Sequence, residues 1–254
     1  MKLYPNKIIW SADLPLDDLC RVLKSGVLPA GIIIKLDRLF FEQFGIHTIN
    51  VVESLGYQVF ADAKIVEIPE KVAQIARHYG QYQPFMLDCM AGICSNGVFA
   101  GSDHKQLDGL KRFASTCLEN SVNPCGVTVL TSKTNAKNRG MVFQEFRRSA
   151  DKQVLFYVSL LSRAGFTDVV CAPKEATVIR KHREFDHLNL NTPGVRLPET
   201  DVRDQARVMT PSKAFGSGAD RLIIGSNLTD GAEQDIVERV HRNWQRLVAH
   251  FGEV

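Results

Sequence analysis

The sequence predicts a single-domain α/β protein, a (β/α)₈ barrel of the TIM type, over residues 1–254. Eight short apolar segments alternate with eight helix-length amphipathic segments, which is the pattern of consecutive βα units. Several apolar segments, such as GIIIK from residue 31 and RLIIG from residue 221, are continuous runs typical of parallel strands buried on both faces. No tandem repeat or low-complexity linker divides the chain. An open doubly wound sheet is the alternative architecture.

The predicted elements follow in order along the chain. Strands are expected at 7–12, 31–36, 58–64, 84–89, 125–131, 168–171, 187–191 and 221–225, and helices at 16–25, 39–55, 69–78, 104–120, 142–164, 173–182, 211–218 and 231–251. Pro69, Pro173 and Pro211 suit the first turn of a helix, and Gly56 and Gly218 suit the residue that follows one. Polar loops at 91–103, 133–140 and 195–208 follow predicted strands, on the barrel face where active sites form.

Composition excludes several classes of protein. Hydrophobic residues make up 44% and charged residues 23%, so the chain can bury a large core and is not disordered. A net charge of +3 is too small to indicate nucleic-acid binding, and the apolar runs are far shorter than the roughly 20 residues of a membrane span. The amino-terminal residues lack the pattern of a signal peptide, and the cysteines lack metal-ligand spacing, which predicts a cytoplasmic protein with reduced thiols.

Charged residues follow the first three predicted strands. Asp13 follows the first, Lys35 ends the second, and Asp62, Lys64 and Glu67 lie at the end of the third or just beyond it. Asp62 and Lys64 are two residues apart and so point to the same side of a strand. A lysine between carboxylates stays protonated and can donate a proton to a carbanion, while an aspartate beside a substrate carboxylate destabilises the ground state. These residue types suit a decarboxylation; an ion-pair network that closes the barrel mouth is the structural alternative.

Eight segments of the chain resemble the signature stretches of the bacterial orotidine 5'-monophosphate decarboxylase family, across about residues 7–230. They are IIWSADLP, IIIKLD, FADAKIVEIP, GVTVLTS, VVCAPKEA, NTPGVR, DQARVMTPSKAFGSGAD and LIIGSNLT. The resemblance implies a homodimeric barrel that needs no metal or organic cofactor. It also implies conversion of a pyrimidine nucleotide, orotidine monophosphate, to uridine monophosphate and CO₂ in pyrimidine biosynthesis.

The same resemblance assigns roles to residues. Lys35, Asp62, Lys64 and Glu67 form the catalytic set, in which Asp62 crowds the substrate carboxylate and Lys64 protonates C6. The substrate-binding residues that the resemblance implies are Asp13 at the ribose, Thr131 or Ser132 at the base, Pro193 and Gly194 in the seventh loop, Arg196 and Gln205 at the phosphate, and Gly225 with Ser226 after the eighth strand.

Three positions depart from the family pattern. Glu67 replaces the last aspartate of D-x-K-x-x-D, the acid that the family lends across its dimer interface. Ser226 replaces the arginine that grips the 5'-phosphate, and Arg221 and Lys133 are the candidates to substitute for it. The fourth strand ends in DCMAG, which assigns no role to Cys89.

These departures leave alternatives open. The first is a related enzyme that acts on a different pyrimidine nucleotide or nucleoside. The second is a nucleotide-binding barrel without catalysis. The D-x-K pair also occurs in metal-using sugar-phosphate lyases and decarboxylases of the same superfamily, although the TPGVR and DQARVMTP stretches favour the nucleotide branch.

Overall fold

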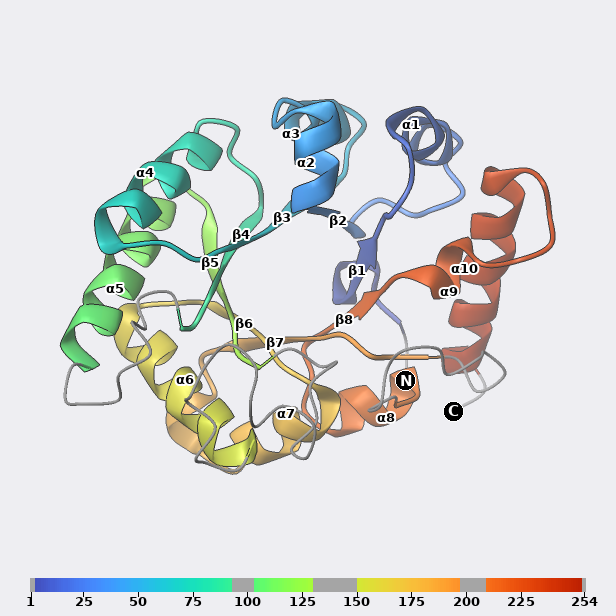
Figure 1. Ribbon diagram of the computed structural model, residues 1–254. Helices are drawn as coiled ribbons and strands as arrows, with labels where there is room; N and C mark the ends of the chain where they lie inside the picture. Colours follow the sequence, from blue (N-terminus) through green and yellow to red (C-terminus); the bar gives the residue numbers. More distant parts are fainter. Residues whose placement is uncertain (1–2, 93–102, 130–149, 197–208, 253–254) are drawn as a thin grey trace, which may run out of the picture.

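Eight parallel strands close into a barrel in the computed structural model, which describes residues 3–92, 103–129, 150–196 and 209–252. The strands pair in sequence order, and β1 pairs with β8 through Ile9 and Ile223. Figure 1 shows the helices arranged around the outside of the strands. The (β/α)₈ prediction is therefore confirmed, and the open-sheet alternative is wrong because the first and last strands are hydrogen-bonded to each other.

The elements alternate along the chain. The strands are β1 (Ile8–Ser11), β2 (Ile33–Asp37), β3 (Gln58–Ile65), β4 (Met86–Met90), β5 (Asn123–Val127), β6 (Asp168–Val170), β7 (Asn189–Thr192) and β8 (Arg221–Ile224). The helices are α1 (Leu16–Lys24), α2 (Arg38–Phe44), α3 (Thr48–Ser54), α4 (Pro69–Gly80), α5 (Asp103–Glu119), α6 (Ala150–Ala164), α7 (Pro173–Ile179), α8 (Pro211–Gly216), α9 (Ser226–Thr229) and α10 (Ile236–Gly252). Short 3₁₀ turns lie at Pro5–Lys7 and Arg183–Phe185.

Some predicted boundaries were wrong. The expected helix at 39–55 is two helices, α2 and α3, because Gly45 ends α2 with φ +84°, a conformation that glycine adopts without a Cβ clash. The fifth strand begins two residues earlier than expected, at Asn123, and the helix expected at 231–251 begins only at Ile236. Proline does occupy the first turn of α4, α7 and α8, as predicted.

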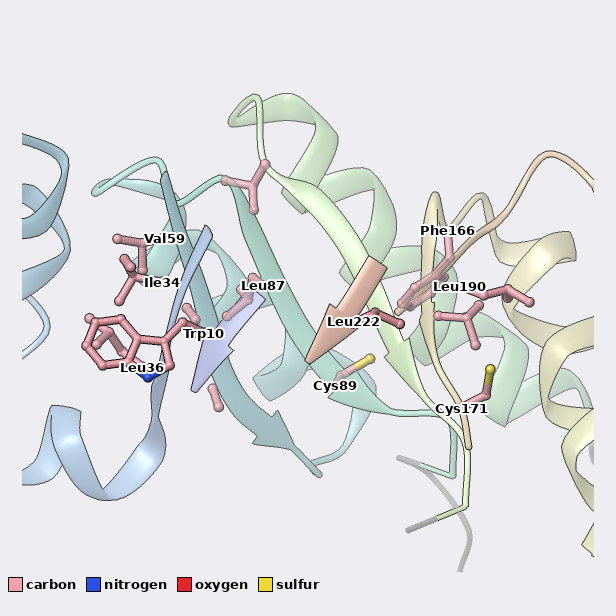
Figure 2. Close-up of a cluster of buried hydrophobic side chains, with 14 of the residues drawn as sticks. Trp10, Ile34, Leu36, Val59, Leu87, Cys89, Phe166, Cys171, Leu190 and Leu222 are labelled. Atoms are coloured by element: carbon pink, nitrogen blue, oxygen red, sulfur yellow. The ribbon is translucent and has the colours of Figure 1, made fainter. Parts of the chain in front are cut away.

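Two apolar layers stabilise the barrel, because alternate strand residues point to opposite faces. The inner layer fills the barrel with Ile9, Ile33, Phe60, Met86, Cys125 and Ile223. The outer layer lies between strands and helices and includes Trp10, Ile34, Leu87, Cys89 and Leu222, all of them labelled in Figure 2. No described helix is long and apolar enough to cross a membrane.

Candidate active site

The cavity lies just above the inner apolar layer, at the carboxyl ends of the strands. Its volume is about 330 Å³. Five of its lining residues each follow an inner-layer residue by two positions on the same strand: Ser11, Lys35, Asp62, Asp88 and Val127. The two-residue period of a strand therefore fills the barrel first with apolar side chains and then, one step further along, with polar ones.

Asp62 bridges two lysines in this cavity. Its Oδ2 lies 2.5 Å from Nζ of Lys35, and its Oδ1 pairs with Nζ of Lys64. The side chains of Lys35 and Asp62 are only 11% and 7% exposed. Burial alone would raise the pKa of Asp62, but the positive charges of Lys35 and Lys64 outweigh it and hold the pKa well below its usual range. Asp62 is therefore an anion fixed in the cavity at neutral pH.

Lys64 has an unusual backbone conformation. Its φ is +44°, in the left-handed region that costs a residue with a Cβ about 1 kcal/mol or more. Its side chain is 44% exposed, so the ammonium stays accessible to a ligand in the cavity. Burial acts to lower the pKa of Lys64, but the acidic neighbours Asp88 and Asp62 outweigh it and raise the pKa above its ordinary value. Lys64 is therefore a protonated group, suited to donating a proton at the cavity wall.

Asp88 of β4 forms the floor of the cavity beside these groups. It is fully buried, and its Oδ1 accepts a hydrogen bond from the backbone N–H of Lys64 at 2.6 Å. Burial and the negative charge of Asp62 raise the pKa of Asp88 well above the ordinary value. Two carboxyl groups in the cavity thus have pKa values pushed in opposite directions, an arrangement typical of catalytic sites.

The ends of β1 and β8 form one side of the cavity. Ser11 donates a hydrogen bond from Oγ to Oδ1 of Asp13 at 3.3 Å. A Cβ on Gly225 would lie 3.6 Å from that of Ser11 and 4.0 Å from Oδ2 of Asp13, so the end of β8 comes close to Asp13. Asp13 and Gly225, to which the resemblance assigns substrate binding, both line the cavity.

The loop after β7 continues this wall of the cavity beside the end of β8, with Pro193, Gly194 and Arg196 in the lining. Arg196 is anchored by its backbone N–H, which donates to the carbonyl oxygen of Met209 at 3.0 Å. The buried side chain of Asn227 donates to the carbonyl oxygen of Val195 at 2.9 Å and ties this loop to α9. Ser226, the first residue of α9, also lines the cavity.

Some of the predicted site residues are not found in the cavity of this single chain. Glu67 lies beyond the end of β3 with an exposed side chain that is not part of the cavity lining, and its Oε2 accepts from the backbone N–H of Ile68 at 3.3 Å. Thr131, Ser132 and Gln205 lie outside the described residues, as does Lys133.

Arg221 was a candidate to replace the phosphate-binding arginine of the family, but its position in the barrel rules this out. It is the first residue of β8 and lies at the opposite end of that strand from Gly225. Its Nη1 lies 2.7 Å from Oδ1 of Asp168, the first residue of β6, and its guanidinium lies over the ring of Phe85. The two-residue period explains the error, since Arg221 shares the inner face with Gly225 but precedes the apolar layer instead of following it.

Sequence reasoning missed Ser11, Asp88 and Asn227. The signal for Ser11 and Asp88 was present, because each lies two residues after an apolar inward-facing residue of its strand. Cys89, to which the sequence assigned no role, has its side chain buried in the outer layer. Asn227 carried no sequence signal, because its partner Val195 lies in a distant loop. Within the described part of the chain, no three His, Cys, Asp or Glu side chains converge in a way that would hold a metal ion.

The barrel, its lysine–aspartate–lysine cavity and its similarity to known proteins together define a decarboxylase, an enzyme of the carbon–carbon lyase class. Residues 6–240 match the model of the orotidine 5'-phosphate decarboxylase / HUMPS family, and the chain belongs to that family.

Relatives and solved structures agree with this membership. The chain is 30% identical over 228 residues to orotidine 5'-phosphate decarboxylase of Glaesserella parasuis, covering 90% of this chain and 94% of that protein. It is 31% identical over 228 residues to the protein of that name from Haemophilus ducreyi, with the same coverage. The crystal structure of orotidine 5'-phosphate decarboxylase from Lactobacillus acidophilus has a TM-score of 0.71 at 20% identity and covers 94% of this chain and 97% of its own, which is a likeness of fold.

Proposed function

We propose that this protein converts orotidine 5'-monophosphate to uridine 5'-monophosphate and CO₂, a step of pyrimidine nucleotide biosynthesis. The observation that carries the proposal is the buried carboxylate of Asp62, held between the ammonium groups of Lys35 and Lys64 in a cavity of about 330 Å³. Family membership and the names of the relatives support the substrate.

In the proposed reaction, the substrate carboxylate lies beside Asp62. Repulsion between the two anions destabilises the bound substrate and is relieved as the bond from C6 to the carboxylate breaks and CO₂ leaves. The electron pair stays on C6, where the nearby ammonium of Lys64 stabilises it and then donates a proton. Lys35 keeps Asp62 ionised and oriented throughout.

The remaining site residues serve binding in this proposal. Asp13 holds the ribose, Thr131 or Ser132 contacts the base, and Arg196 with Gln205 binds the phosphate. Pro193, Gly194, Gly225 and Ser226 shape the wall of the cavity between them. Among the described residues, three cationic side chains line the cavity. Lys35 and Lys64 come from β2 and β3, and Arg196 comes from the β7–α8 loop across the barrel from them, which is the side of the phosphate in this proposal. We propose that the chemistry proceeds with no cofactor.

We further propose that the active protein is a homodimer. Val66 and Ile68, which flank Glu67, are exposed apolar side chains, and so is Leu39 after the neighbouring strand β2. All three follow the carboxyl ends of β2 and β3, the strands that carry the two lysines, and exposed apolar side chains that gather on one face are typical of a surface that a partner covers. Glu67 is then presented toward the cavity of the second subunit, one methylene longer than the aspartate of the family.

A related enzyme that acts on a nucleoside or on a different pyrimidine nucleotide is the second candidate. The observation that favours it is Ser226 at the position of the family's phosphate-binding arginine, together with the engagement of Arg221 by Asp168 at the far end of the barrel.

The test follows the ultraviolet absorbance of orotidine monophosphate mixed with purified protein, with Lys64→Ala as the control. We expect the orotate band to disappear with the wild-type protein and to persist with the variant. A stable band with both proteins, while both are folded, would overturn the proposed substrate. The same assay with orotidine then tests the second candidate.

A further inference from the structure

The third and fourth strands fall out of register at the catalytic lysine. Ala61 pairs with Leu87 and Ile65 pairs with Cys89, so β3 has three residues between these pairs where β4 has one. The three residues are Asp62, Ala63 and Lys64, and the one residue opposite them is Asp88. A bulge of this kind re-aims the side chains that it carries, and such bulges are common next to active sites.

Asp88 satisfies the backbone group that the bulge takes out of the strand ladder. Oδ1 of Asp88 accepts the N–H of Lys64 at 2.6 Å, at the residue whose backbone adopts a φ of +44°. Oδ2 of Asp88 is also buried and accepts no hydrogen bond from the described residues, and the carboxyl group of Asp62 lies close enough to share a proton with that of Asp88. Asp88 thus has one oxygen committed to the backbone of Lys64, and its carboxyl group also adjoins that of Asp62 at the floor of the cavity.

We propose that Asp88 is the positioning residue of Lys64, and that its carboxyl oxygen holds the Lys64 backbone in the left-handed conformation from which the ammonium reaches Asp62 and the cavity. The role of Lys64 as proton donor rests on the proposed function, but the contact between Asp88 and Lys64 does not. In this arrangement Asp88 acts through Lys64 and need not touch the substrate.

The uncharged form of Asp88 suits this role. A second ionised carboxylate buried beside the anion of Asp62 is costly, whereas a neutral Asp88 accepts the N–H of Lys64 and directs its own proton toward Asp62. The titratable groups around it are Asp62 and Lys64 of β3, Lys35 of β2, Cys125 of β5 and Tyr79 of α4. A neutral Asp88 leaves Asp62 as the anion that pairs with both lysines, and Asp88 adds to the raised pKa of Lys64 only where Asp88 itself ionises.

Two substitutions of Asp88 test whether Lys64 depends on the hydrogen-bond acceptor or only on the volume of the side chain. Asp88→Asn keeps an acceptor oxygen and stays neutral, whereas Asp88→Leu fills the space without an acceptor. We expect Asp88→Leu to lower kcat for orotidine monophosphate by about 100-fold with KM changed by less than about threefold, because a catalytic group displaced by about 1 Å loses rate on this scale. Asp88→Asn should stay within about fivefold of wild type.

The matched control is Asp168→Asn, which alters another buried aspartate of the barrel interior at the end far from the cavity. We expect it to change stability and not the ratio of kcat to KM. If Asp88→Leu does not fold, Asp88→Ala replaces it, since alanine also lacks the acceptor.

A second measurement needs no substrate. The amide resonance of Lys64 in protein labelled with [¹⁵N]lysine, assigned by its loss in Lys64→Arg, reports the hydrogen bond directly. We expect Asp88→Asn to preserve its chemical shift and slow hydrogen exchange, and Asp88→Leu to lose both.

The two measurements also separate this proposal from the proposed function. Failure of the wild-type protein to decarboxylate overturns the function, while the amide resonance still tests the positioning role. An unchanged Lys64 amide in Asp88→Leu, or an Asp88→Asn variant as inactive as Asp88→Leu, would overturn the role of Asp88.

Discussion

Lys35 and Asp62 form an ion pair inside the barrel, with Nζ of the lysine 2.5 Å from Oδ2 of the aspartate. The two residues come from the neighbouring strands β2 and β3, and both side chains are almost completely buried. Removal of one partner from such a pair leaves an uncompensated charge in a medium of low polarity. The pair therefore contributes to the fold as well as to the cavity.

The first prediction concerns this pair. We expect Lys35→Met to lower the free energy of unfolding by about 3 kcal/mol, because Asp62 would then retain only the more exposed Lys64 as a partner. Urea denaturation measures the change. The control is Arg38→Met, which breaks the exposed pair between Arg38 and Glu42 and should cost less than about 1 kcal/mol. An equal loss of unfolding free energy in the two variants would show that the buried pair contributes no more to stability than the exposed one.

The second prediction concerns pH. The pKa of Asp88 is raised by burial and by the charge of Asp62, so the folded protein binds this proton more tightly than the unfolded chain does. Stability from Asp88 is therefore present at low pH and is lost as pH rises from the ordinary carboxyl pKa of about 4 toward the raised folded value. Asp62 has the opposite sign, because its lowered pKa gives stability above about pH 4 that is lost as pH falls.

Asp88→Asn removes the loss of stability with rising pH that Asp88 causes, because asparagine does not titrate. We expect the variant to gain stability relative to wild type as pH rises above about 4, by at most about 1.4 kcal/mol per pH unit. Thermal unfolding of both proteins from about pH 5 to about pH 8 measures the difference. A difference that stays constant over this range would show that Asp88 does not titrate there with a raised pKa.

The third prediction concerns the phosphate. We expect Ser226→Arg to lower KM for orotidine monophosphate by about tenfold, because a charge-assisted hydrogen bond to phosphate contributes on the order of 1.5 kcal/mol. KM for orotidine, which lacks the phosphate, should not fall. Thr229→Arg, at the other end of α9, is the control. Equal effects on both substrates would argue against a phosphate near Ser226.

The fourth prediction concerns the dimer. Ile68 is 61% exposed beside Glu67, and Leu118 is 51% exposed at the end of α5. We expect Ile68→Glu to convert dimers to monomers in sedimentation velocity and to lower decarboxylation, since a buried unpaired charge opposes association. Leu118→Glu should leave both properties unchanged. A monomeric wild-type protein, or an Ile68→Glu dimer, would overturn the proposed interface.

Local patterns in the sequence predicted much of this protein. Continuous apolar runs and helix-length segments indicated eight βα units. This pattern depends on residues close in sequence, and the chain itself therefore determined it. The two-residue spacing of Asp62 and Lys64 indicated a shared side of β3, and the two side chains do pair, but a bulge lies between them and the regular strand period does not explain the contact. The same reasoning failed at Gly45, where a single residue in the left-handed region divides a predicted helix.

Contacts between distant segments were decided only by the tertiary structure. The bulge in β3 leaves Lys64 opposite Asp88, 24 positions away, and barrel closure leaves Arg221 paired with Asp168 instead of near the cavity. Such contacts depend on the register between strands and on the closure of the whole sheet, which sequence spacing does not encode. The sequence by itself determined the barrel and the charged residues of β2 and β3. The packing of strands against one another decided which carboxyl group holds Lys64 and which arginine is unavailable to a phosphate.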